Sequence, residues 1–118
     1  MIAHLVKHPF FTLWATRPNP VPGKKALKVP LHLDGTTPHS LADPATPLDW
    51  HTALACAEFT GARLGFRPHT STGICCIDLD DCIDASGNWS EHALAVLAML
   101  PGAAVEISVN GTGLHFWF

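Results

Sequence analysis

An apolar segment that ends in a cluster of carboxylates constrains the fold of this chain more than any other feature. Residues 74–79 are apolar apart from Asp78, which is typical of a buried β-strand, and Asp80, Asp81 and Asp84 follow directly. Because side chains alternate between the faces of a strand, Asp78 and Asp80 are expected to point the same way, roughly 7 Å apart at Cα. Two like charges in that position repel, and a divalent cation removes the repulsion.

The last sixteen residues, AAVEISVNGTGLHFWF, predict a β-hairpin with its turn at residues 110–113. This turn would place Val109 opposite Leu114, Ser108 opposite His115, and Glu106 opposite Trp117. Directly opposed residues share a face. One face then carries only apolar side chains: Val105, Ile107, Val109, Leu114, Phe116 and Phe118. The other carries an acid, a hydroxyl and an imidazole: Glu106, Ser108 and His115, with Trp117.

If the hairpin lies beside the strand that carries Asp78 and Asp80, these polar side chains form one site. Carboxylate oxygens suit Mg²⁺ or Mn²⁺. A calcium loop of the EF-hand type is excluded, because Ile83 stands where that loop needs glycine. Taken alone, an aspartate pair at a strand end is more often a turn or a helix cap, and His115 alone is more often structural. The combination favours a site.

The remaining pattern predicts a strand over 10–16, two loop-rich connections over 17–30 and 31–47, and a helix over 48–59. Thr46 is the expected N-cap of that helix, with Pro47 and Asp49 in its first turn. Its expected core residues are Trp50, Leu54, Ala57 and Phe59. A second helix follows Ser90 as its N-cap, with Leu94, Leu97 and Leu100 at helical spacing. The predicted fold class is α+β, an α/β sandwich with a mostly antiparallel sheet.

Length and composition bound the class of protein. The chain has 118 residues, of which 47% are hydrophobic, so we expect one domain over 1–118 with a small core. It has no apolar run long enough to cross a bilayer and no signal-peptide pattern. Its four cysteines include no C-x-x-C pair, which favours a reducing cytoplasm. The net charge of −3 argues against a general nucleic-acid coat protein, although Lys24, Lys25 and Lys28 belong to a basic N-terminal stretch.

The segment GICCIDLDDCID, the helix after it and the segment VEISVNGTGLHFWF together resemble the N-terminal catalytic domain of phage and plasmid primase-polymerases, in the archaeo-eukaryotic primase superfamily. The family pattern is a hydrophobic strand ending in D-x-D, a helix, and then E-[IV]-S-x-S-G-T-G-x-H. Here Asn110 replaces the second serine. The family's K-x-P and D-P-x-x-W elements also have counterparts upstream, so the resemblance covers roughly residues 11–118.

The resemblance implies template-directed nucleotidyl transfer with Mg²⁺ or Mn²⁺. Asp78, Asp80 and Glu106 match the metal-binding acids, and His115 matches the histidine that contacts the incoming nucleotide. Ser108, Gly111, Thr112 and Gly113 would line the triphosphate site. Asp81 is given a secondary role, because the alternation of side chains along the strand places it on the face opposite Asp78 and Asp80.

The partners that the resemblance implies are a single-stranded DNA template or primer, nucleoside triphosphates, and a helicase in cis or in trans. The setting would be the cytoplasm of a bacterial, archaeal or phage-infected cell, with no membrane. Because the family domain normally continues beyond this point, we expect the catalytic core to be incomplete at its C-terminus. Two other functions stay open: a non-catalytic nucleotide- or DNA-binding replication module, and a metal-dependent nuclease.

Overall fold

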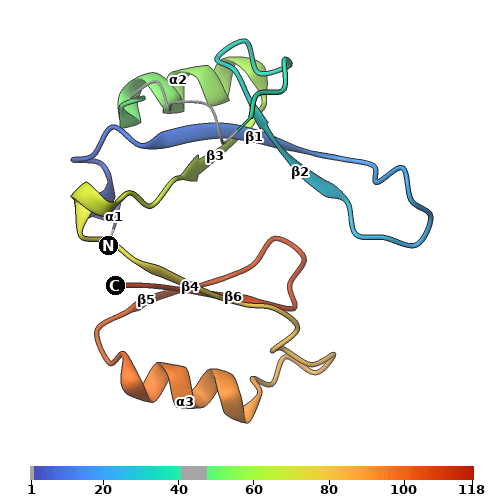
Figure 1. Ribbon diagram of the computed structural model, residues 1–118, viewed down its shortest axis with the longest axis vertical. Coiled ribbons are helices and arrows are strands. Elements are labelled where there is room, and N and C mark those ends of the chain that lie inside the picture. Colours follow the sequence, from blue (N-terminus) through green and yellow to red (C-terminus); the bar gives the residue numbers. More distant parts are fainter. Residues whose placement is uncertain (1, 41–47) are drawn as a thin grey trace. The chain divides into compact units, whose positions relative to one another are not determined.

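The computed structural model describes residues 2–40 and 48–118, and it has the predicted α+β class, with helices and two small antiparallel sheets (Figure 1). The chain divides into two compact units, Ile2–Arg67 and Pro68–Phe118. The single catalytic domain expected over 1–118 stays a prediction. Within the described ranges, no helix has both the length and the apolar character needed to cross a membrane.

The unit Ile2–Arg67 is built on a three-stranded antiparallel sheet in the order β2-β1-β3. Its elements in chain order are α1 (Ile2–Leu5), β1 (Phe11–Arg17), β2 (Leu27–Leu31), α2 (Trp50–Thr60) and β3 (Arg63–Phe66). Sequence patterns predicted β1 but missed β2, which lies in segments expected to be connections, and β3. Both missed strands are edges, where Pro30 is tolerated in β2 and Gly65 in β3.

Helix α2 packs its small side chains against this sheet. Ala57 contacts the core formed by Leu13 and Leu31, and the ring of Trp50 meets that of Phe11 at 5.2 Å between centroids. The prediction that Phe59 faces the core is wrong, because its side chain is 92% exposed.

The start of α2 also differs from the expectation. Asp49, predicted inside the first turn, is the N-cap, and its side chain accepts a hydrogen bond from the backbone N–H of Thr52. The expected cap Thr46 and the expected first-turn Pro47 lie outside the described residues. Gly61 ends the helix in the left-handed conformation, with a φ of 74°.

The unit Pro68–Phe118 is a three-stranded antiparallel sheet in the order β4-β6-β5 with one α-helix. Its elements in chain order are the 3₁₀ turn η1 (Thr70–Thr72), β4 (Cys76–Leu79), α3 (Glu91–Met99), β5 (Ala104–Ile107) and β6 (Leu114–Trp117). The sequence therefore predicted every element of this unit except the 3₁₀ turn. As expected, Ser90 is the N-cap of α3, where its hydroxyl accepts a hydrogen bond from the N–H of Ala93.

The core of this unit lies between α3 and one face of the sheet. Leu114 and Phe116 of β6 are fully buried there, against Ala93 and Val96 of α3. Of the three leucines at helical spacing, Leu100 packs against this core, whereas Leu94 is 51% exposed.

Candidate functional site

Three strands bring an acid, a histidine and a second acid into one row across the sheet β4-β6-β5. The central strand β6 carries His115, which pairs directly with Asp78 of β4 on one side and with Glu106 of β5 on the other. Directly opposed residues share a face, so the three side chains project from the same face of the sheet. Strand parity predicted this grouping of the three side chains.

The two acids contact opposite nitrogens of the same imidazole ring. Nδ1 of His115 lies 2.7 Å from Oε1 of Glu106, and Nε2 lies 3.4 Å from Oδ1 of Asp78. The His115 side chain is only 18% exposed, whereas Asp78 and Glu106 are 63% and 57% exposed. The ring is therefore fixed within the sheet, while both carboxylates remain open to solvent and to a ligand.

The hairpin register differs from the prediction by two residues. Glu106, expected opposite Trp117, pairs with His115, and Ile107 pairs with Leu114. A shift of two residues preserves which side chains share a face, so the polar and apolar faces of the strands survive the correction. The shift lengthens the turn, which runs from Ser108 to Gly113, and it brings Glu106 into direct contact with the histidine.

Hydrogen bonds within this turn explain its length. The Ser108 hydroxyl donates to Oδ1 of Asn110 at 2.5 Å and accepts from the N–H of Gly113 at 2.9 Å. Oδ1 of Asn110 also accepts from the N–H of Thr112 at 3.3 Å, and the N–H of Gly111 donates to the Ser108 carbonyl at 2.8 Å. The amides of Gly111, Thr112 and Gly113, in the segment predicted to line the triphosphate site, therefore donate inside the turn.

Glycine is required at both ends of the G-T-G segment, for different reasons. Gly111 has a φ of 80°, a conformation that residues with a Cβ rarely adopt. Gly113 has an ordinary φ, but a Cβ there would lie 2.7 Å from the carbonyl oxygen of Leu79 and 3.0 Å from the Ser108 hydroxyl. The turn is thus pressed against the end of β4, close to the row of three side chains.

Thr112 ties this turn to the chain that follows β4. Its carbonyl accepts from the N–H groups of Cys82 and Ile83, at 2.8 and 2.9 Å. Its hydroxyl lies 3.3 Å from Oδ1 of Asp81, which has a φ of 48°. The sequence analysis gave Asp81 a secondary role, because side chains alternate along a strand and the strand was assumed to continue through this residue. The left-handed backbone turns Asp81 toward Thr112 instead, and aspartate is one of the few residues that tolerate this conformation.

The remaining predicted acid, Asp80, lies in the turn directly after β4 and is exposed. It has no hydrogen bond or ion pair to another residue in the part of the chain that the structure describes. By contrast, Asp78 contacts His115. The two aspartates expected to form a pair therefore have different surroundings, and only Asp78 belongs to the row.

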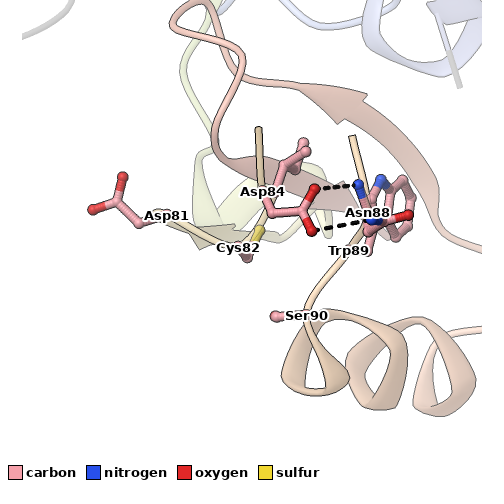
Figure 2. A pocket seen from close by; sticks show the side chains of 7 residues that line it. Asp81, Cys82, Asp84, Asn88, Trp89 and Ser90 are labelled. Carbon is pink, nitrogen blue, oxygen red and sulfur yellow. Dashed lines mark hydrogen bonds between the residues drawn. The ribbon is translucent and has the colours of Figure 1, made fainter. Parts of the chain in front are cut away.

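Asp84 organises a local turn and takes no part in the row. Its carboxylate accepts from the backbone N–H groups of Asn88 and Ser86, both at 2.8 Å, and from the Asn88 side chain at 3.1 Å. Hydrogen bonds from Asn88 and Ser86 hold the pKa of Asp84 below its ordinary value. Figure 2 shows Asp84 joined to Asn88, with Asp81 directed away from both.

The hollow beside this turn has a volume of about 180 Å³, less than the roughly 300 to 1,000 Å³ of typical small-molecule pockets.

Cys76 lies two residues before Asp78 on β4 and was not among the predicted site residues. Burial, with the negative charges of Asp78 and Glu106, raises the pKa of its thiol to about 11. The alternation of the strand gave a signal for this, because Cys76 shares the face of Asp78.

The donor set fits Mg²⁺ or Mn²⁺ in one arrangement only. Within residues 2–40 and 48–118, no three His, Cys, Asp or Glu side chains converge as a ready-made metal cluster. The ring of His115 lies between Asp78 and Glu106 and holds them on opposite sides. Magnesium, however, is usually bound by one or two carboxylates together with water and substrate phosphates. Asp78, with Asp80 two residues further on, fits that mode, whereas Glu106 is engaged with His115.

Comparison of the chain with protein-family models and with curated proteins found no match.

Proposed function

We propose that this chain carries the nucleotide site of a template-directed DNA primase or polymerase, which acts in phage or plasmid replication. The observation that supports this proposal is the row formed by Asp78, His115 and Glu106, which adjoins the turn that contains Gly111 and Gly113. Carboxylates can hold the metal ion that transfer of a nucleotide from its triphosphate uses, and an imidazole and a glycine-rich turn beside them can bind the phosphates.

Asp78 and Asp80 are assigned to Mg²⁺ or Mn²⁺. When bound, the ion would neutralise phosphate charge and favour attack by a 3′-hydroxyl. Both carboxylates are exposed, so a nucleotide that arrives with its own phosphate ligands can complete the coordination shell. This division of ligands does not require a third acidic side chain at the ion.

His115 is assigned to a phosphate oxygen of the incoming nucleotide. With Glu106 as acceptor for Nδ1, the imidazole is held in one orientation and its Nε2 faces Asp78. In its doubly protonated form, in which both ring nitrogens donate, a histidine held in this way can donate from Nε2 to a phosphate oxygen that displaces the 3.4 Å contact with Asp78. Glu106 then acts as a positioning residue, a narrower role than that of the metal ligand expected from the sequence.

The turn supplies further donors if one side chain moves. Oδ1 of Asn110 accepts from both the Ser108 hydroxyl and the Thr112 amide. A phosphate oxygen in the same place would accept from the same two groups. Rotation of Asn110 away from the turn would therefore release two donors toward a triphosphate. A nuclease has no need for such donors, which is why nucleotide transfer is preferred to hydrolysis of a strand.

The substrates in this proposal are nucleoside triphosphates and a single-stranded DNA template or primer, and a helicase is the expected partner. The proposal is tested by calorimetric titration of the chain with Mn²⁺, with and without a deoxynucleoside triphosphate. We expect the nucleotide to bind only with Mn²⁺ and only in proteins that retain Asp78. Glu91→Gln is the matched control, because it removes one exposed carboxylate from the first turn of α3.

Binding that is unchanged in Asp78→Asn and Asp80→Asn would refute the assignment of these residues. If the nucleotide binds as proposed, incorporation of labelled nucleotide into a primed strand separates a polymerase from a binding module. Loss of intact single-stranded DNA with Mn²⁺ alone would instead support a nuclease.

A further inference from the structure

One face of the sheet β2-β1-β3 carries chemistry that the proposed nucleotide site does not use. In the strand register, Trp14 of β1 pairs with Pro30 of β2 and with Arg63 of β3, while Thr16 pairs with Lys28. Leu13, one residue before Trp14, belongs to the core beneath α2. Because neighbouring residues of a strand point to opposite faces, Trp14 and its partners lie on the face away from that core.

This face is basic, although the chain as a whole is acidic. Lys28 and Arg63 are both exposed, on the two edge strands, with Trp14 between them on the central strand. None of the strand residues on this face is acidic: Thr12, Trp14, Thr16, Lys28, Pro30, Arg63 and Gly65. The net charge of the chain is −3, so a local excess of positive charge next to an aromatic ring is a departure from its average composition.

The indole and the guanidinium on this face form a fixed pair. The guanidinium carbon of Arg63 lies over the Trp14 ring, 5.2 Å from its centroid, as in a cation–π interaction. The indole N–H donates to the carbonyl of Leu64 at 3.2 Å. A Cβ on Gly65 would lie 3.2 Å from Cδ1 of the indole, so this glycine lets the ring lie against β3. The pair is therefore held in place before any ligand arrives.

We propose that this face binds single-stranded nucleic acid, with a base stacked on the Trp14–Arg63 pair and backbone phosphates bound by Arg63 and Lys28. Bases stack on aromatic rings and on guanidinium planes, and a groove or face with cations beside such a platform follows the backbone without reading sequence. An acidic peptide would use the two cations but would leave the indole without a role. The inference deepens the proposed function by giving its polymer strand a place, and its test requires no catalysis.

The test is fluorescence anisotropy of the full chain with a labelled single-stranded oligonucleotide of about 15 nucleotides, long enough for one such site. EDTA is present, so that metal and nucleotide binding cannot contribute. The variants are Trp14→Leu, Arg63→Gln, Arg63→Lys and Lys28→Gln. The matched control is Lys24→Gln, which removes an equally exposed cation from the loop between β1 and β2. Circular dichroism establishes that each variant is folded.

We expect Trp14→Leu and Arg63→Gln each to weaken binding by roughly fivefold or more, in line with the loss of one stacked base. Arg63→Lys should bind the oligonucleotide more weakly but with the same salt dependence. Lysine keeps the positive charge but lacks the guanidinium plane on which a base can stack. Lys28→Gln should lower the salt slope by about 0.7, the value for one phosphate contact on a single strand. Lys24→Gln should bind the oligonucleotide with an affinity within about twofold of that of the parent, because Lys24 contacts no phosphate in this arrangement.

The proposal is overturned if the parent does not bind the oligonucleotide, or if folded Trp14→Leu binds like the parent. It is also overturned if Lys24→Gln weakens binding as much as Lys28→Gln, or if polyglutamate or duplex DNA competes as well as single-stranded DNA. The two proposals fail separately. Oligonucleotide binding in EDTA that depends on Trp14 stands whether or not the chain binds a nucleotide with Mn²⁺, and nucleotide binding that depends on Asp78 stands whether or not the oligonucleotide binds.

Discussion

Glu106 and His115 face one another across the pair β5–β6, with Oε1 of the acid 2.7 Å from Nδ1 of the imidazole. This contact indicates that Glu106 positions the histidine and is not a metal ligand. Glu106→Gln keeps an acceptor near Nδ1 but removes the negative charge that strengthens the hydrogen bond from Nδ1. We expect Mn²⁺ binding to Asp78 to persist, while affinity for a triphosphate falls by roughly three- to tenfold, which corresponds to about one ordinary hydrogen bond. Calorimetry with and without nucleotide measures both quantities.

Because Glu106 is more than half exposed, the same substitution should change the free energy of unfolding by no more than about 0.5 kcal/mol. A complete loss of Mn²⁺ binding in folded Glu106→Gln would show that the acid is a metal ligand after all, as the sequence suggested.

Asn110 is predicted to compete with a triphosphate for two hydrogen-bond donors of the turn. Its Oδ1 accepts from the Ser108 hydroxyl and from the Thr112 amide. Asn110→Ala removes this internal acceptor, so both donors become available to phosphate. We expect triphosphate affinity to rise by roughly twofold to tenfold, a change comparable to one hydrogen bond. Equal or weaker affinity in Asn110→Ala would mean that the side chain stabilises the turn rather than competing with the ligand.

Cys76 provides a reporter for the charge of the site. Burial first, and then Asp78 and Glu106, raises the pKa of its thiol to about 11, so near pH 8 it should react slowly with iodoacetamide. Removing a nearby negative charge favours the thiolate. Asp78→Asn should therefore move the alkylation profile to lower pH and raise the rate at pH 8 by roughly twofold to tenfold.

Mass spectrometry of the modified peptide measures this rate, in a Cys75→Ser background because Cys75 is adjacent and exposed. Saturating Mn²⁺ should have the same direction of effect as Asp78→Asn if the ion binds beside Asp78. A profile that neither treatment moves would show that burial alone sets the pKa of Cys76.

Gly113 is predicted to be intolerant of any side chain. A Cβ would lie 2.7 Å from the carbonyl oxygen of Leu79, a backbone atom that cannot move without disturbing the pair β4–β6. Gly113→Ala should lower the free energy of unfolding by about 1–3 kcal/mol, as overpacked sites do. Gly102→Ala is the control, because nothing lies within 4 Å of its Cβ position and its φ is not positive. Urea denaturation of both variants gives the comparison, and equal midpoints would contradict the predicted clash.

The sequence was most informative where the alternation of side chains along a strand decides which residues share a face. Asp78, His115 and Glu106 share a face whether the hairpin turn has four or six residues, because both registers preserve the alternation. The pairing itself could not be predicted, since it depends on the hydrogen bonds of Ser108 and Asn110 inside the turn.

Edge strands and helix faces were harder to predict. Pro30 and Gly65 both disfavour strands in general, yet each lies in an edge strand where its weakness is tolerated. In α3, Leu94 is half exposed although it shares the helical spacing of Leu97 and Leu100, and the small residue Ala93 beside it lies in the core. Such outcomes depend on tertiary packing, which short-range patterns do not contain.

The row of Asp78, His115 and Glu106 has one further consequence, which concerns the coupling of ligand binding to folding. Its members come from three strands, and its two contacts exist together only when both strand pairs have formed. An unfolded chain therefore cannot hold the same ligand. By mass action, whatever binds to the row raises the free energy of unfolding of residues 68–118, by about 2.7 kcal/mol at a hundred times its dissociation constant. The melting temperature of this unit thus reports binding directly, whichever reaction the bound ligand later undergoes.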